Sequence, residues 1–136
     1  MKTLALDIGD SWTGIAISDS LGMFAKPYTT IATHNLLQKI TEILSEQSIG
    51  TIVVGYPKTM RGTESKQTQK IVALKQKLET AISSVKWLLW DERLSSKRAQ
   101  KIKKTRTKEE KIKSHAIAAS FILDSYLTHL SIRKNT

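Results

Sequence analysis

Residues 4–17 read LALDIGDSWTGIAI, an apolar run that is interrupted by two aspartates and two glycines. The apolar residues on either side predict two buried strands, residues 3–8 and 14–18, that form a hairpin. Glycine adopts backbone angles that other residues resist, which suits a tight turn between them. Asp7 then stands at the end of a buried strand, where an ionised carboxylate is costly unless a positive group pairs with it. We therefore hypothesise that Asp7 binds a metal ion.

Composition limits the classes of protein to consider. The 136 residues fit one domain, residues 1–136, that is large enough to bury a core. The absence of cysteine excludes disulfides, thiolate zinc sites and cysteine nucleophiles. No window is apolar over the roughly 18 residues of a membrane span, and the amino terminus does not resemble a signal peptide. We expect a cytoplasmic protein, without membrane association, that is a monomer or a weak homodimer.

The remaining chain predicts alternating helices and strands. Residues 24–31 predict a strand at a sheet edge, because Pro27 cannot donate a hydrogen bond to a neighbouring strand. Thr33 or Asn35 is a candidate cap for the helix that follows. The further predicted elements are a helix from residue 36 to about 48, a buried strand at residues 51–54, a helix over residues 71–82, a strand at residues 85–90 and a helix over residues 112–130.

This order predicts an α/β fold with a mixed five-stranded sheet, in which three antiparallel strands are followed by two parallel ones and helices flank the sheet. Ligands of such sheets bind at the carboxyl ends of the parallel strands. Asp7 and Glu92 each follow or end a strand that borders residues 51–54, so their carboxylates could converge on a hard cation such as Mg²⁺. Alternatively, Arg93 forms a salt bridge with Asp91 or Glu92, and these acids are structural.

The charge of the chain favours a polyanionic partner. Lys and Arg number 22 against 12 Asp and Glu, which gives a formal net charge of +10. Such a charge attracts nucleic acid through phosphate contacts and counterion release, although it does not distinguish RNA from DNA and also occurs in proteins that are merely soluble. We expect a basic, mobile segment at residues 97–111 and a frayed tail at residues 131–136. The expected nucleic-acid contacts are Lys58, Arg61, Arg93, Lys97, Arg98, Lys101, Lys103, Lys104 and Arg106.

Four motifs occur in order along the chain, and together they resemble a known family. They are LDIG with TGIAISD at residues 6–9 and 13–19, GYP with MRGTE at residues 55–57 and 60–64, WDERLSS at residues 90–96, and AASFILDSYL at residues 118–127. From about residue 3 to residue 128 they resemble the motifs of the YqgF/RuvX family of RNase H-like nucleases.

The resemblance implies an RNase H-like fold, a divalent metal cofactor, and a bacterial, cytosolic nuclease that matures the 5′ end of pre-16S rRNA in ribosomal precursors. Some relatives are described instead as Holliday-junction resolvases. The resemblance also implies catalytic and metal-binding residues at Asp7, Glu92 and His115. The third position usually carries Asp, so the imidazole of His115 should hold Mg²⁺ less strongly and favour Mn²⁺. In the alternative interpretation, His115 lies at the amino end of the helix and bonds to backbone or water.

Other interpretations of the sequence remain open. Trp12 stands near a position where the family usually carries Lys or Arg, and it either covers the core or stacks on an exposed base. A decayed site would leave an RNA-binding ribosome-assembly factor. The Asp7–Gly14 turn also resembles the phosphate loop of actin-like ATPases, but one domain of this size does not form a two-lobed cleft. Further expectations are that Trp87 and Trp90 serve packing, that His34 and His129 are surface residues, and that Asp10 and Asp19 are reserve members of the site.

Overall fold

The computed structural model describes residues 1–56, 65–91 and 108–134, and within these the predicted α/β fold is confirmed. The strands form one five-stranded sheet in the order β3-β2-β1-β4-β5. Strand β1 is antiparallel to β2 and parallel to β4, β2 is antiparallel to β3, and β4 is parallel to β5. The elements are β1 (Lys2–Ile8), β2 (Trp12–Ser18), β3 (Ala25–Ala32), the 3₁₀ helix η1 (Thr33–Asn35), α1 (Leu36–Glu46), β4 (Ile49–Tyr56), α2 (Lys66–Ala81), β5 (Lys86–Asp91) and α4 (Lys108–Lys134).

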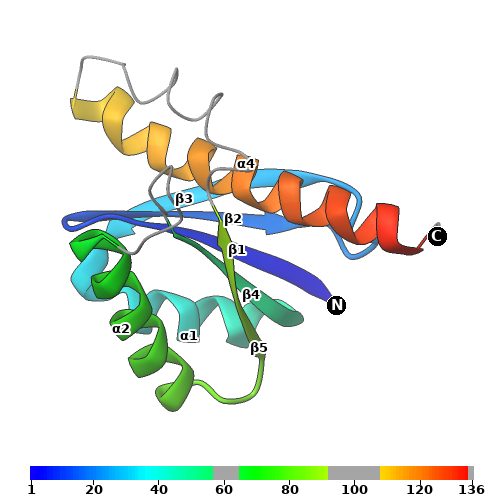
Figure 1. Cartoon of the computed structure of the whole chain (residues 1–136), viewed down its shortest axis with the longest axis horizontal. Helices are drawn as coiled ribbons and strands as arrows, with labels where there is room; N and C mark the ends of the chain where they lie inside the picture. Colours follow the sequence, from blue (N-terminus) through cyan, green and yellow to red (C-terminus); the bar gives the residue numbers. More distant parts are fainter. Residues whose placement is uncertain (57–64, 92–107, 135–136) are drawn as a thin grey trace.

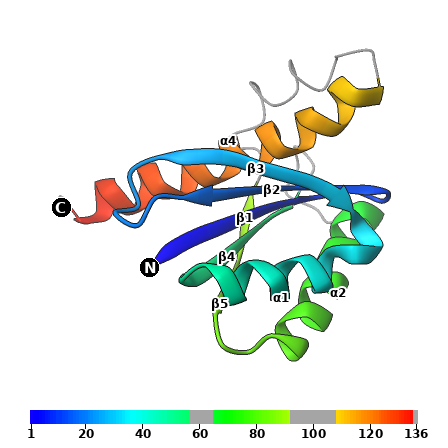
Figure 2. The same cartoon turned by 180° about the vertical axis from the view of Figure 1, so that it is seen from behind.

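The sheet separates two layers of helices, with α4 on one face and α1 and α2 on the other (Figures 1 and 2). Successive side chains of a strand point to opposite faces, so each central strand contributes to both layers. On β1, Leu4, Leu6 and Ile8 join the core beneath α1 and α2, whereas Ala5 joins the core beneath α4. The small residues Ala5 and Ala16 on the α4 side allow this helix to lie close to the sheet.

Helix α4 is longer than the apolar pattern predicts. It begins at Lys108 and ends at Lys134, so residues 108–111 of the expected mobile segment and residues 131–134 of the expected frayed tail are helical. These residues carry no apolar periodicity, but Lys and Glu are good helix formers and extend a helix that is anchored by its central residues. Among the helices that the structure describes, none is long and apolar enough to cross a membrane.

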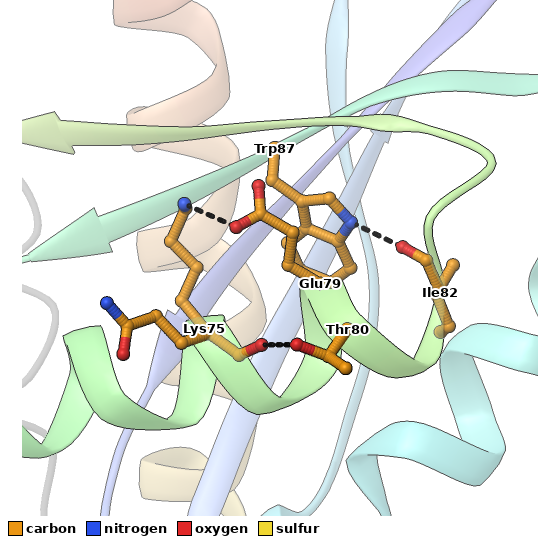
Figure 3. Close-up of polar contacts among 6 residues, drawn as sticks. Lys75, Glu79, Thr80, Ile82 and Trp87 are labelled. Carbon is orange, nitrogen blue, oxygen red and sulfur yellow. Dashed lines mark hydrogen bonds and ion pairs between the residues drawn. The ribbon is translucent and has the colours of Figure 1, made fainter.

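The connection between α2 and β5 is fixed by packing and by one indole hydrogen bond (Figure 3). Trp87 is 6% exposed, and its Nε1 donates to the carbonyl of Ile82 at 2.9 Å, just beyond the end of α2.

Ser65 begins the same helix by accepting a hydrogen bond from the backbone N–H of Thr68 at 3.2 Å. At the other end of β5, the indole N–H of Trp90 donates to Ser125 of α4 at 3.1 Å. Both tryptophans therefore serve packing, as predicted.

Asp19 organises the turn between β2 and β3. Its Oδ1 accepts hydrogen bonds from the backbone N–H groups of Met23 at 2.8 Å and Phe24 at 2.9 Å. The hydrogen bond from Phe24 is the largest cause that lowers the pKa of the Asp19 carboxyl below its ordinary value. Desolvation opposes it as the second largest effect, and the hydrogen bond from Met23 adds to the lowering. The turn thus uses the ionised carboxylate, and Asp19 lies at the opposite end of β2 from the turn that follows Asp7.

The lowered pKa of Asp19 predicts how stability depends on pH. The folded state holds the Asp19 proton less tightly than the unfolded chain, so ionisation stabilises the fold above the unfolded pKa and this contribution disappears as pH falls through the folded pKa. We expect Asp19→Asn to lower the free energy of unfolding at pH 7 and to approach the wild-type value in acid. Urea unfolding of both proteins at several pH values measures this difference. A difference that does not change with pH would contradict the assignment.

Candidate active site

Asp7 lies near the carboxyl end of the central strand β1 and is 4% exposed. Because it is two residues from Ala5, the alternation of the strand directs its side chain to the α4 face of the sheet. It pairs in register with Gly14 of the neighbouring strand β2. A buried carboxylate at this position must be compensated by hydrogen bonds or positive charge. The structure therefore supports a chemical role for Asp7 more than a packing role.

His115 approaches Asp7 from α4. Its Nδ1 lies 3.3 Å from Asp7 Oδ2, and the His115 side chain is 25% exposed. The helix begins at Lys108, so His115 lies about two turns inside it. The alternative is therefore wrong in placing His115 at the amino end of the helix, and Nδ1 contacts a side chain. Two residues that are 108 positions apart in the sequence form one pair.

Gly14 allows this pair to form. A Cβ atom built on Gly14 would lie 1.9 Å from the carbonyl oxygen of His115 and 2.5 Å from the backbone nitrogen of Ala116. These are backbone atoms of a helix, and they cannot move aside as the end of a flexible side chain does. The absence of a side chain at position 14 therefore lets α4 cross β2 at the residue that carries the imidazole.

Gly9 has a similar role in the turn between β1 and β2. Its N–H donates to the carbonyl of Trp12 at 2.9 Å, and a Cβ at Gly9 would lie 2.7 Å from that oxygen and 3.5 Å from Cε1 of His115. The turn that follows Asp7 therefore passes close to the imidazole, with room for little more than a methyl group between them. The Trp12 side chain is partly buried.

The carboxyl end of β5 reaches the same edge of the sheet. Val54 of β4 pairs with Leu6 of β1 on one side and with Leu89 of β5 on the other. Two residues further along, Tyr56 of β4 pairs with Asp91 of β5. Glu92 comes next in the chain but lies outside the described residues. The expected basic contacts also lie outside them, namely Lys58, Arg61, Arg93, Lys97, Arg98, Lys101, Lys103, Lys104 and Arg106.

The reserve acids do not join Asp7. Asp10 is exposed, and its carboxylate lies 3.9 Å from Nζ of Lys70 on α2. His34 and His129 are exposed, as predicted, and the ring of His129 lies 5.3 Å from that of Trp90. Among residues 1–56, 65–91 and 113–133, no group of three His, Asp or Glu side chains is arranged to hold a metal ion. The described part of the candidate site is thus the Asp7–His115 pair.

A groove of about 450 Å³ lies between β3 and α4, and neither Asp7 nor His115 lines it. It is lined by Pro27 to Thr30 on the strand and by Lys113, Ala116 and Ile117 on the helix. Thr30 pairs with Gly14, which in turn pairs with Asp7, so the groove begins two strands away from the carboxylate. Lys113 is exposed and gives this surface a positive charge.

One polar contact at the site was not predicted from the sequence. Thr33 was expected to cap a helix, but its hydroxyl donates to the carbonyl of Gly9 at 2.7 Å, and no side chain caps α1 at Asn35. The partner lies 24 positions earlier in the chain, and no local pattern identifies a contact of that separation.

Replacing Gly14 should be strongly destabilising. We expect Gly14→Ala to lower the free energy of unfolding by about 3 kcal/mol or more, because the added methyl group meets helix backbone rather than a movable side chain. Gly50→Ala is a matched control, since a Cβ there meets the flexible Met1 side chain at 3.1 Å, and its cost should stay under about 1 kcal/mol. Urea unfolding measures both, and equal effects would contradict the close approach.

Comparison with known proteins shows which family the chain is similar to. The sequence matches the family model described as "RuvX: Holliday junction resolvase" over residues 1–129. A "Putative pre-16S rRNA nuclease" of Thermoanaerobacter pseudethanolicus is 38% identical, and the match covers 93% of this chain and 96% of that protein. A protein of the same name from Clostridium tetani is 39% identical, with the same coverage of 93% and 96%.

The solved structure of Thermus thermophilus RuvC superposes with a TM-score of 0.58 at 12% identity and covers 96% of both chains, which shows the RNase H-like fold. The fold and the family resemblance expected from the motifs are therefore confirmed. Since the family match spans residues 1–129 and the relatives align over nearly their whole length, this chain belongs to the RuvX family.

Proposed function

We propose that this chain is a divalent-metal-dependent endonuclease that acts on structured nucleic acid, and that it processes the 5′ end of pre-16S rRNA. The observation that carries the proposal is the buried Asp7 carboxylate at the end of the central strand, with the His115 imidazole 3.3 Å from it. A buried acid paired with a titratable partner is a common arrangement in active sites.

The donor atoms fit a divalent ion. A carboxylate oxygen suits Mg²⁺ and Mn²⁺, whereas an imidazole nitrogen is a softer ligand that favours Mn²⁺ over Mg²⁺. In the proposal Asp7 and Glu92 hold the ion, with His115 in support. If bound there, the ion would activate water for attack on a phosphodiester and stabilise the charge on the leaving oxygen.

The residues of this chain have separate tasks in the proposal. Asp7 is buried from bulk water, and its carboxylate provides negative charge that attracts the divalent ion. When His115 carries its proton on Nδ1, that N–H donates to Asp7 Oδ2 and fixes the orientation of the carboxylate, as histidine–carboxylate pairs do around metal sites. Gly9 and Gly14 place the turn and the helix so that the two side chains meet.

The substrate is proposed to approach across the groove between β3 and α4. Lys113 and the basic segments of the chain would contact phosphates of the substrate. Such contacts are independent of nucleotide sequence and make the binding affinity depend on salt concentration. Pre-16S rRNA is preferred as the substrate because relatives with 38% and 39% identity carry that name, whereas the RuvC structure is only 12% identical. A four-way DNA junction is the alternative, on the description of the family model.

A cleavage assay tests the proposal. A 5′ fragment of pre-16S rRNA and a four-way DNA junction would each be incubated with the protein in Mg²⁺ and in Mn²⁺. We expect the wild type to cleave the RNA, and Asp7→Asn to reduce the rate at least about 100-fold because the carboxylate is lost. Asp124→Asn makes the same change at an exposed position of α4 and should stay within about twofold of wild type.

Each other outcome selects a different function. Cleavage confined to the junction would support a resolvase. No cleavage by the wild type beyond the Asp7→Asn level would refute the nuclease. In that case salt-dependent RNA binding that survives Asp7→Asn would support an assembly factor, for which the irregular third position His115 is the motivating observation.

The choice of metal is tested at His115. We expect His115→Asp to strengthen Mg²⁺ binding about tenfold and to reduce the preference for Mn²⁺, because it replaces an imidazole by a charged oxygen ligand. His129→Asp makes the same change at an exposed position of the same helix and should leave the ratio of the two affinities unaltered. Isothermal titration calorimetry measures both. The same Mg²⁺-to-Mn²⁺ ratio in His115→Asp as in wild type would exclude His115 from the metal site.

A further inference from the structure

Thr33 lies directly after the edge strand β3 and joins it to the turn that follows Asp7. Its backbone N–H donates to the carbonyl of Ser11 at 2.9 Å, and its Oγ1 donates to the carbonyl of Gly9 at 2.7 Å. The same Oγ1 lies 2.9 Å from Oγ1 of Thr13. One residue therefore makes three hydrogen bonds to the segment from Gly9 to Thr13.

Which of the two threonine hydroxyls donates to the other follows from the number of protons that each carries. A threonine hydroxyl has one proton to donate and accepts through its lone pairs. The Thr33 proton is directed to Gly9, so Thr13 must donate its own proton to Thr33. Thr13 is fully buried, and this contact satisfies a polar group that would otherwise be costly. Thr13 thus supports the hydroxyl that holds Gly9.

Gly9 is consequently held on both of its backbone polar groups. Its N–H bonds to Trp12 within the turn, and its carbonyl bonds to Thr33 across the sheet. Gly9 is two residues beyond Asp7, and a Cβ on it would meet His115 Cε1 at 3.5 Å. A displacement of Gly9 would therefore be transmitted along the chain to Asp7.

We propose that Thr33 is a positioning residue of the active site, an inference that rests on the proposed nuclease function. Thr33, supported by Thr13, fastens the turn so that the Asp7 carboxylate and the His115 imidazole keep the separation that the reaction requires. Residues that orient a ligand without touching the substrate affect the rate of the chemical step, because small misplacements of reacting groups lower that rate strongly. The edge strand β3 and the start of α1 are thereby connected to the site.

The test uses three substitutions in the full chain. Thr33→Val keeps the shape of the side chain and removes the hydroxyl, whereas Thr33→Ser keeps the hydroxyl. Thr41→Val is the matched control, since the Thr41 hydroxyl donates to the carbonyl of Leu37 on the exposed face of α1. For each protein, kcat and KM for RNA cleavage, the Kd for Mn²⁺, and hydrogen exchange of the Gly9 amide would be measured.

We expect Thr33→Val to lower kcat roughly tenfold with little change in KM, to weaken Mn²⁺ binding and to accelerate exchange of the Gly9 amide. Thr33→Ser should restore all three, and Thr41→Val should resemble wild type. If Thr33→Val does not fold, Thr13→Val removes only the supporting hydrogen bond and should shift the same quantities in the same direction by a smaller factor.

The outcomes separate this inference from the proposed function. A wild-type protein that neither cleaves nor binds Mn²⁺ would refute the function. Unchanged exchange of the Gly9 amide in Thr33→Val would refute the fastening of the turn, whatever the activity. A loss of kcat that Thr33→Ser does not restore would refute the role of the hydroxyl in positioning.

Discussion

The close approach between Gly14 of β2 and the backbone of α4 is the constraint on which the site depends. A side chain at this position would overlap the carbonyl of His115, so the helix could not lie at its observed depth. At that depth His115 reaches Asp7 on the neighbouring strand, 3.3 Å away. Sheet packing and site geometry are thus consequences of the same missing side chain, supported by the small residues Ala5 and Ala16 on the same face.

Much of the fold follows from patterns that a sequence carries locally. The apolar runs predict the strands and their order, and Pro27 places β3 at an edge, where the structure has it. The predicted boundaries differ from the observed ones at several elements, because hydrophobicity does not set them: β2 begins at Trp12 and α2 begins at Lys66, both earlier than predicted. Strand β4 extends over Gly50 and Tyr56, whose backbone pairing with its neighbours continues beyond the apolar residues, and α4 extends into polar residues at both ends.

The candidate site was predictable only in part. Asp7 stands out because an acid in an apolar run demands compensation, and the family motif indicates His115. The contact between them depends on how α4 crosses the sheet, which no local signal specifies. The role of Thr33 was not predicted for a related reason. A threonine before a helix is usually a helix cap, whereas the partner of Thr33 is Gly9, in the turn between β1 and β2. Long-range polar contacts are the part of the site that required the structure.

The central claim is that Asp7 and His115 belong to one metal-dependent site. Anomalous diffraction from crystals soaked in Mn²⁺ tests it most directly, because it locates the ion without reference to activity. We expect an anomalous peak bonded to the Asp7 carboxylate and in contact with His115. A peak elsewhere on the protein, or no peak at Asp7 in crystals of well-ordered protein, would contradict it.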